Sequence, residues 1–329
     1  MKNKLLLSLA AATVLAVGSD AIINTTVNEP QVLAVKTKKH HKKRQAAKYR
    51  PRLLKKHPTC IIGQSSLPDA QSLINTSKLP KGTHYSWKKK PEINQPASYS
   101  SGNAKIKVTY PDHSVDVVPV TFKLYGKNEI VMPVDYKADD VDQADRTNQA
   151  TATLRKATED GMEFNVFIPE SPADDHEKVD YYHLTNDQKK RLNEFAVDLI
   201  NEARAALGTS SVDTDDEVLV AADRVASEYN HDHYAYSQKH DVPGLHRALD
   251  QYDSWAEDMD CQYDKPKNMT DMKEFVYNSI MAYIFNNISW EWHHAASIIG
   301  TNDVNLSRLA ISYTKASDGL YVTHFIFLP

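Results

Sequence analysis

One stretch near the end of the sequence constrains the fold more than any other. Residues 321–327 read Tyr-Val-Thr-His-Phe-Ile-Phe and are almost wholly apolar, apart from Thr323 and His324. A strand with apolar side chains on both faces belongs inside a layered fold, where helices cover the sheet. A second strand is predicted just before it, because the apolar side chains of residues 309–313 alternate along the chain.

Four helices are predicted upstream of these strands. The first begins with a capping box at Thr185–Gln188, in which a hydroxyl and an amide satisfy free backbone amide hydrogens, and it ends at Gly208. A second capping box, Thr214–Glu217, opens the next helix. Two more helical patterns cover Thr270–Asn286 and, more briefly, about Trp290 to Ile299. Helices followed by strands in one region indicate an α+β protein.

The first half of the chain shows a different pattern, with apolar residues at every second position. Residues 104–110 and 118–124 each alternate in this way, which predicts two half-buried strands. Pro111–Ser114 supplies turn residues between them, so the pair is predicted to form a hairpin. Pro119 cannot donate a hydrogen bond to a ladder, and we therefore expect its strand to lie at an edge or to carry a bulge.

Residues 1–21 have the pattern of a secretory signal peptide. Lys2 and Lys4 supply positive charge, thirteen mainly apolar residues follow at Leu5–Val17, and Ser19–Ala21 offers a cleavage site. The apolar run is short for a membrane span. The pattern therefore predicts an exported protein, with an uncleaved N-terminal anchor as the alternative interpretation.

Charge is distributed unevenly along the chain. Lys36–His57 contains eleven Lys or Arg residues and no acid, whereas the chain from Pro58 onward contains 26 basic and 41 acidic residues. Repulsion among like charges predicts a basic, disordered linker over residues 22–58. Its expected partner in an exported protein is an anionic envelope polymer, such as teichoic acid, or a lipid surface, and nucleic acid is not expected. A solvated linker without a partner is the alternative.

The two cysteines, Cys60 and Cys261, fall in different predicted domains. We therefore expect two free thiols, with a bridge between domains or between chains as the alternative.

The sequence contains no His-Glu-x-x-His, no Gly-x-Ser-x-Gly and no Gly-rich phosphate loop, so it lacks these motifs of zinc proteases, serine hydrolases and nucleotide-binding enzymes. Residues 127–183 are rich in acids and are predicted to connect the two domains.

The β-patterned region carries a characteristic series of residues. In order, they are Asp69-Ala70, Leu79–Thr83, Tyr85–Trp87, Pro91, Pro96, Val108–Ser114 and Val118–Val120. This series resembles the Rib/alpha repeat of Gram-positive surface proteins over roughly residues 65–124. The resemblance implies a small, immunoglobulin-like β domain at 59–126 that acts as a stalk or spacer, with Trp87 in its core.

A second ordered series lies in the last part of the chain. It consists of Leu199–Arg204 with Leu207-Gly208, His240–Val242, Glu257-Asp258, Trp292–Ala295, Ser297-Ile298 and His324–Phe327. This series resembles the CAP superfamily of cysteine-rich secretory, antigen-five and pathogenesis-related proteins, and within it the PgrA-type bacterial surface-exclusion proteins. The resemblance implies an α/β/α sandwich over residues 184–329, and so a CAP-like domain that follows the small β domain in an α+β chain.

Members of that superfamily carry two histidines and two acidic residues in a cavity. By motif position His240 matches the first histidine, Glu257 the first glutamate and His294 the second histidine, whereas no residue matches the second glutamate. The usual Glu-Asn pair is Glu257-Asp258 in this chain. Two imidazoles and a carboxylate that converge could hold a divalent metal such as zinc, with one position open, or could move protons.

Each of these residues also has a structural interpretation. His240 could be an exposed loop histidine, Glu257 a solvated surface acid, and His294, which follows His293, could pack or cap a helix. His324 lies on the predicted buried strand and is expected as a hydrogen-bonded core histidine more than as a ligand. Trp292 is expected in the core or in the lining of a cavity, and it completes the set of candidate ligand-binding residues.

These observations predict a secreted protein, extracellular or attached non-covalently to the surface of a Gram-positive cell. Its expected role is a binding or interaction module, in surface exclusion or adhesion, whose CAP-like domain meets a protein or lipid ligand and needs no cofactor. One alternative is a metal-assisted hydrolase of peptide or cell-wall material that uses His240, Glu257 and His294. The other is a lipid carrier with residues 277–292 along a groove.

Overall fold

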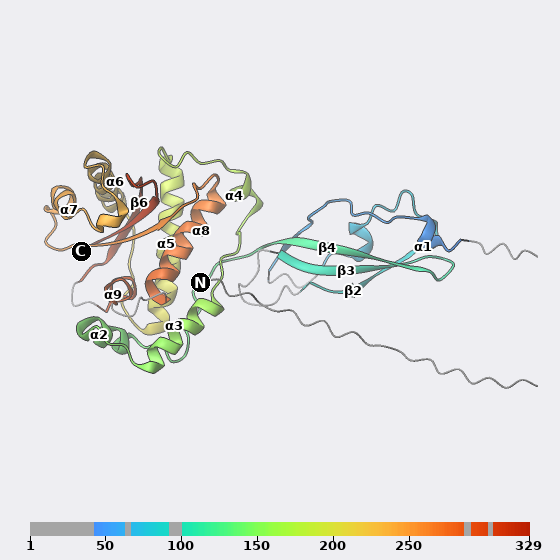
Figure 1. Ribbon diagram of the computed structural model, residues 1–329, viewed down its shortest axis with the longest axis horizontal. Coiled ribbons are helices and arrows are strands. Elements are labelled where there is room, and N and C mark those ends of the chain that lie inside the picture. The colour runs from blue at the N-terminus through green and yellow to red at the C-terminus, as the bar shows by residue number, and fades with distance from the viewer. Residues whose placement is uncertain (1–42, 63–66, 92–100, 286–290, 302–304) are drawn as a thin grey trace, which may run out of the picture. The chain divides into compact units, whose positions relative to one another are not determined.

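The computed structural model describes residues 43–62, 67–91, 101–285, 291–301 and 305–329 (Figure 1). The expected signal peptide at 1–21 and the first part of the expected linker lie outside the described residues. Within the described residues, no helix is both long enough and apolar enough to cross a membrane.

The first sheet has four strands in the order β1-β4-β3-β2. Its strands are β1 (Thr59–Ile61), β2 (His84–Lys89), β3 (Ser101–Thr109) and β4 (Val115–Tyr125). β3 and β4 form the predicted hairpin, while β1 runs parallel to β4. β1 pairs only with residues 123–125, so Pro119 sits where β4 has β3 as its single neighbour. Pro119 has no amide hydrogen to donate, and this single neighbour allows it to fit in β4 even though β4 lies between two other strands of the sheet.

One face of this sheet packs on a core of its own, to which every second residue of β3 and β4 contributes. Ile106, Val108 and Phe122 are fully buried there, and the short 3-10 helix η1 (Ala70–Leu73) packs against them. Trp87, expected in the core, is partly buried and packs against it, with its ring centroid 6.0 Å from that of Phe122.

The second half of the predicted linker packs on this β domain. It contains the helix α1 (Gln45–Lys48), whose first amide donates a hydrogen bond to Asp112 at 2.7 Å. The Tyr49 ring stacks on the ring of Tyr110, with centroids 5.8 Å apart. The structure thus corrects the expected linker over residues 45–57, because Tyr49 and Leu53 give this basic segment an apolar side that can be buried.

The acid-rich residues 127–183, expected as a connector, contain three helices. They are α2 (Ala138–Thr147), α3 (Ala152–Phe164) and α4 (Pro172–His176). α3 continues through Gly161, although glycine has a low helix propensity. A side chain at this position would clash with the ring of Phe285, so glycine allows a close approach between α3 and a later helix.

Four of the later helices correspond to those predicted, and one was missed. The five helices are α5 (Asn186–Leu207), α6 (Asp216–His231), α7 (Val242–Leu249), α8 (Met269–Phe285) and α9 (His293–Ile299). The capping box at Thr185 is present with both of its hydrogen bonds, and Gly208 ends α5 in the left-handed conformation at φ 74°. α7 is the unpredicted helix, and a 3-10 turn, η2 (Tyr236–Gln238), precedes it.

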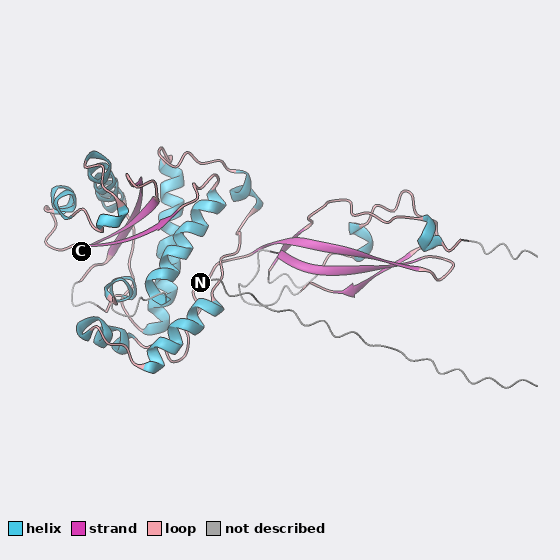
Figure 2. Cartoon of the chain, in the orientation of Figure 1, coloured by secondary structure: helices cyan, strands magenta, loops and turns pink. Residues whose placement is uncertain are grey.

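The second sheet has three antiparallel strands in the order β5-β7-β6. They are β5 (Ala256–Gln262), β6 (Arg308–Lys315) and β7 (Tyr321–Leu328). β7 is the central strand, as its apolar pattern predicts. Figure 2 shows helices on both sides of this sheet.

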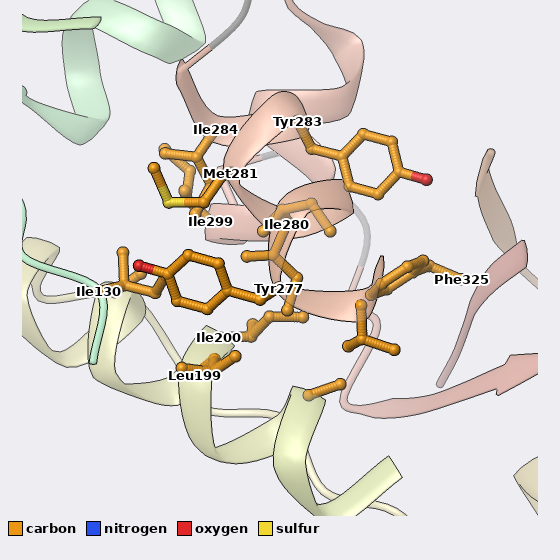
Figure 3. Close-up of a cluster of buried hydrophobic side chains, with 14 of the residues drawn as sticks. Ile130, Leu199, Ile200, Tyr277, Ile280, Met281, Tyr283, Ile284, Ile299 and Phe325 are labelled. Atoms are coloured by element: carbon orange, nitrogen blue, oxygen red, sulfur yellow. The ribbon is translucent and has the colours of Figure 1, made fainter. Parts of the chain in front are cut away.

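The side chains of β7 alternate between two apolar layers. Phe325 and Phe327 enter the larger core with α5, α8 and α9, part of which Figure 3 shows around Tyr277. Ile326 and Leu328 enter the smaller core with α6 and α7. This arrangement confirms the α/β/α sandwich and, with the β domain, the α+β fold class.

Candidate functional site

The edge strand β5 carries two adjacent acidic residues that point to opposite faces of the sheet. Successive side chains of a strand alternate between its faces. Glu257 contacts Tyr229 of α6 on one side, and Asp258 contacts His294 of α9 on the other. Both carboxylates are buried. A buried carboxylate needs hydrogen bonds or charged partners, and both residues have them.

The carboxylate of Glu257 accepts three hydrogen bonds. Oε1 accepts one from Nδ1 of His324 at 2.7 Å, and Oε2 accepts one from Nδ1 of His240 at 2.9 Å. The hydroxyl of Tyr229 donates the third to Oε2 at 2.7 Å. Burial alone would raise the pKa of Glu257, but the hydrogen bonds and charges of the two histidines lower it to about 2. Glu257 is therefore ionised at neutral pH.

His324 is held inside the sandwich. Its side chain has no exposed surface, its Nε2 lies 2.7 Å from the hydroxyl of Thr314, and its ring lies against that of Tyr229 with centroids 4.4 Å apart. Both ring nitrogens thus have partners within the protein. His324 is the hydrogen-bonded core histidine that its place on a buried strand suggests, and it serves to hold Glu257.

His294 forms a separate pair with Asp258. Its Nδ1 lies 2.5 Å from Oδ1 of Asp258, and its Nε2 lies 3.7 Å from a carboxylate oxygen of Glu291. Burial alone would lower the pKa of His294, but the hydrogen bond and charge of Asp258, with the charge of Glu291, outweigh burial and raise it. The neighbouring His293 pairs instead with Asp145 of α2, so His294 is the histidine that belongs to this cluster.

The two pairs meet at the exposed edge of the sheet. The rings of His240 and His294 lie 6.4 Å apart between centroids. Their side chains keep 33% and 26% of their surface exposed, whereas Glu257 and Asp258 are buried behind them. Each histidine uses Nδ1 for its carboxylate, which orients the ring. A ligand would therefore meet Nε2, which in His294 also lies 3.7 Å from a carboxylate oxygen of Glu291.

The geometry does not bring the three predicted metal ligands around one point. His240 and Glu257 contact each other directly, and His294 joins them only through the contact of its ring with His240. Both oxygens of Glu257 already accept hydrogen bonds from histidines. In the described part of the chain no group of three or more His, Cys, Asp or Glu side chains could hold a metal ion. The residues therefore do not fit a three-ligand metal centre.

The remaining candidates are structural. Trp292 precedes α9 and is buried, as expected for a core residue, although its Nε1 has no hydrogen-bond partner among the described residues. Cys60 and Cys261 are free thiols, and burial raises the pKa of each. Neither cysteine contacts the cluster of histidines.

The sequence-based set missed two residues of the cluster. Tyr229 lies among the buried apolar residues of α6, and its hydroxyl is the only feature in the sequence that indicates contact with a buried acid. Its oxygen also accepts a hydrogen bond from the backbone amide of Asp241 at 2.9 Å, which ties α6 to the start of α7. Asp258 had been noted only as a departure from the Glu-Asn pair, yet it supplies the second carboxylate.

The fold and this cluster place the chain in a class that joins a small β domain to an α/β/α sandwich with paired histidines and carboxylates. A family model described as the Rib domain matches residues 45–125. The sandwich is similar to the solved structure of the CAP domain of enterococcal PrgA, with a TM-score of 0.51 and 20% identity over 61% of this chain and 85% of that one. The chain thus combines a Rib domain with a CAP-like domain.

Two further solved structures are similar to parts of the chain. A Rib domain from Streptococcus pyogenes is 32% identical over 25% of this chain and 98% of that one, with a TM-score of 0.21. An outer surface protein from Borrelia burgdorferi is 14% identical over 46% of this chain and 96% of that one, with a TM-score of 0.29. No curated protein matches the chain.

Proposed function

We propose that this chain is a secreted, surface-associated binding protein whose CAP-like domain holds a ligand at His240 and His294. The observation that carries this proposal is the contact between the two imidazoles at the edge of the sheet, each backed by its own buried carboxylate. Side chains fixed by such partners present ring nitrogens in a defined direction, which is what selective binding of a small polar group requires.

The charge state of the cluster indicates the chemistry of that group. Because the pKa of His294 is raised, this ring is protonated over a wider pH range than an ordinary histidine, and its Nε2 can donate a charge-assisted hydrogen bond to a ligand in place of its 3.7 Å contact with Glu291. A carboxylate or phosphate on a protein or lipid ligand would accept it. Ligands of this kind suit the roles in adhesion or surface exclusion that we propose for the protein.

The burial and the hydrogen bonds of the Glu257 carboxylate favour a binding function over the hydrolase alternative. A general base needs a free lone pair near its substrate, and this carboxylate is buried and accepts three hydrogen bonds. The lipid-carrier alternative has less support. The residues of α8 proposed to line a groove, including Tyr277 and Tyr283, are buried in the larger core (Figure 3).

The proposal includes attachment to the envelope through the basic segment Lys36–His57. An anionic polymer such as teichoic acid would be held by the Lys and Arg side chains of this segment, and the association would weaken as salt screens them. Release of the protein from whole cells by increasing salt tests this part of the proposal. Release that does not change with salt would contradict it.

The ligand site is tested by binding the fluorescently labelled full chain to intact Gram-positive cells. His240→Ala and His294→Ala should each reduce salt-resistant binding, because each removes one of the two exposed imidazoles. His293→Ala is the matched control, since this exposed histidine precedes His294 on α9 and pairs with Asp145 outside the cluster. Equal binding by all four proteins would refute a ligand site at these histidines.

A calorimetric zinc titration of the same proteins examines the metal-dependent alternative. Stoichiometric zinc binding that is lost in both His240→Ala and His294→Ala would favour that alternative over the one proposed here. Binding that is absent, or unchanged in both variants, would leave the protein or lipid ligand as the explanation for cell binding.

A further inference from the structure

The Rib domain itself carries a strong positive charge. Residues 45–125 contain 13 Lys or Arg and four Asp or Glu residues, a formal charge of +9, whereas residues 126–329 contain 18 basic and 37 acidic residues. The basic character is therefore not confined to the segment before the first sheet. It belongs to the folded β domain, where the structure shows how the charges are arranged.

The lysines gather on the face of the sheet that is turned away from its core. Along β3 the residues alternate, so Ile106 and Val108 are buried while Lys105 and Lys107 are exposed. Lys89, at the end of β2, is exposed as well. We refer to Lys89, Lys105 and Lys107 as the lysine face.

The register of the two strands places like charges next to one another. Lys89 is paired directly with Lys105 across β2 and β3, and side chains in such pairs have their Cβ atoms about 5 Å apart. Lys107 follows Lys105 on the same face after about 7 Å of strand. Like charges placed directly opposite each other repel, which makes this arrangement unfavourable for the isolated domain.

No acidic side chain compensates the lysine face within the described residues. None of its three lysines forms an ion pair there, in contrast to many other basic residues of the chain. Asp116 is the acid nearest in the hairpin, but it belongs to the core-facing set of β4 and accepts a hydrogen bond from Tyr110 at 2.8 Å. The positive charge on this face is therefore available to an external anion.

The other residues of the face are suited to a polar chain. Ser86 and Val117 flank Lys107 on the neighbouring strands, and Val117 keeps 40% of its surface exposed. Asn103 and Thr121 lie opposite each other further along the sheet and are joined by a hydrogen bond of 3.1 Å. Hydroxyl, amide and small apolar groups beside the ammonium groups can contact the neutral units of a polymer as well as its charges.

We propose that the lysine face of the Rib domain binds a linear, phosphodiester-linked polymer of the cell envelope. A flexible polyanion can place successive phosphates beside lysines that lie close together on an open surface, and it displaces bound counterions when it does so. A folded acidic protein holds its carboxylates at fixed positions, and these would have to match the positions of several flexible lysine side chains. The proposal rests on the surface location in the proposed function, but not on the His240–His294 site.

The test compares two double variants of the full chain that lose the same charge. Lys105→Gln with Lys107→Gln alters the lysine face, and Lys78→Gln with Lys81→Gln alters two exposed lysines in the loop before β2. Fluorescence anisotropy measures binding to purified poly(glycerol phosphate) at several salt concentrations, with neutral dextran as the control polymer. Thermal unfolding confirms that both variants are folded.

The lysine-face variant should bind poly(glycerol phosphate) several-fold more weakly, with a logarithmic salt dependence shallower by about 1 to 1.5. The loop variant should stay close to the unaltered chain, and dextran should not bind. Equal losses in the two variants would show that only net charge matters and would overturn the proposal, as would a lysine-face variant that binds normally.

A third variant separates this inference from the proposed attachment by the basic segment. In it, five lysines of that segment are changed to Gln: Lys36, Lys38, Lys39, Lys42 and Lys43. If the lysine face binds the polymer, the Lys105 and Lys107 substitutions weaken binding in this background too. If they have no effect there, the face has no affinity of its own and the inference fails, whatever the cell-binding results for His240 and His294.

Discussion

His240 and His294 approach each other from opposite faces of one strand, and their rings end 6.4 Å apart. His240 lies just before α7 on the side of Glu257, while His294 lies on α9 on the side of Asp258. They meet because β5 is the edge strand of its sheet, so side chains from both layers can pass around it. The geometry of the site therefore depends on two consecutive carboxylates of β5.

Glu257→Gln should destabilise the protein by about 3–5 kcal/mol, because it removes the buried negative charge to which two histidines and a tyrosine donate hydrogen bonds. Urea unfolding of the full chain, followed by circular dichroism, measures this loss. Glu217→Gln is the control, since Glu217 is an exposed partner of Arg308 and its loss should cost no more than about 1 kcal/mol. Similar values for the two variants would contradict the role given to Glu257.

Acid should remove the contribution of Glu257. Its pKa in the folded protein is about 2, below the ordinary value of about 4.3 for glutamate, so its stabilisation is complete above the unfolded-state value and is lost as pH falls toward 2. The difference in unfolding free energy between the unaltered chain and Glu257→Gln should thus shrink between pH 5 and pH 2.5. A difference that stays constant over this range would argue against an ionised Glu257.

His294 should show the opposite dependence on pH. Its pKa is raised in the folded protein, so the stabilisation from Asp258 is complete below the ordinary histidine value of about 6.5 and is lost as pH rises through the folded value. His294→Gln should cost about 1.5–3 kcal/mol at pH 5.5, as expected for a hydrogen bond to a charged group, and less at pH 9. Chemical denaturation at both values measures this, and a cost that grows with pH would contradict the assignment.

Gly161→Ala should destabilise the protein by about 1–3 kcal/mol, because the added methyl group would overlap the ring of Phe285. In the background of Phe285→Leu the same change should cost less, since the smaller side chain leaves room. A double-mutant cycle based on thermal unfolding measures this coupling. Additive effects of the two substitutions would show that α3 and Phe285 do not constrain each other.

Lys105→Thr should stabilise the Rib domain by about 0.2–1 kcal/mol in the absence of polymer, because it removes the charge directly opposite Lys89. Threonine also suits a strand. The comparison is with Lys78→Thr, whose position in a loop offers no such gain. A loss of thermal stability in Lys105→Thr that exceeds the change in Lys78→Thr would mean that the two lysines do not repel each other appreciably.

Local patterns predicted those parts of the fold in which they and the tertiary packing agree. The apolar run of residues 321–327 gave the central strand, and the capping box at Thr185 gave the start of α5. α7 was missed because it opens with Val-Pro-Gly, which favours a turn. Pro243 fits the first turn of a helix, where its missing amide hydrogen has no partner to lose, and the side chain of Asp241 caps that end.

The site was predicted in part for the same physical reason. Motif positions found His240, Glu257 and His294, but spacing along the chain contains no information on which carboxylate each histidine meets. That pairing follows from the alternation of side chains in β5 and from the position of this strand at the edge of the sheet, and both are known only once the strands are ordered. The sequence did not predict that residues 45–57 pack on the β domain, because the apolar Tyr49 and Leu53 stand among many basic residues in this segment.

The position of β5 at the edge of its sheet also has a mechanical consequence. A ligand that touches both imidazoles would join the α6/α7 layer to the α8/α9 layer outside the strand that separates them. Such a ligand would hold β5 in the sheet, because β5 could not separate from β7 unless the ligand lost its contact with one of the two histidines. Backbone amides of β5 should then exchange with solvent deuterium more slowly when the ligand is bound.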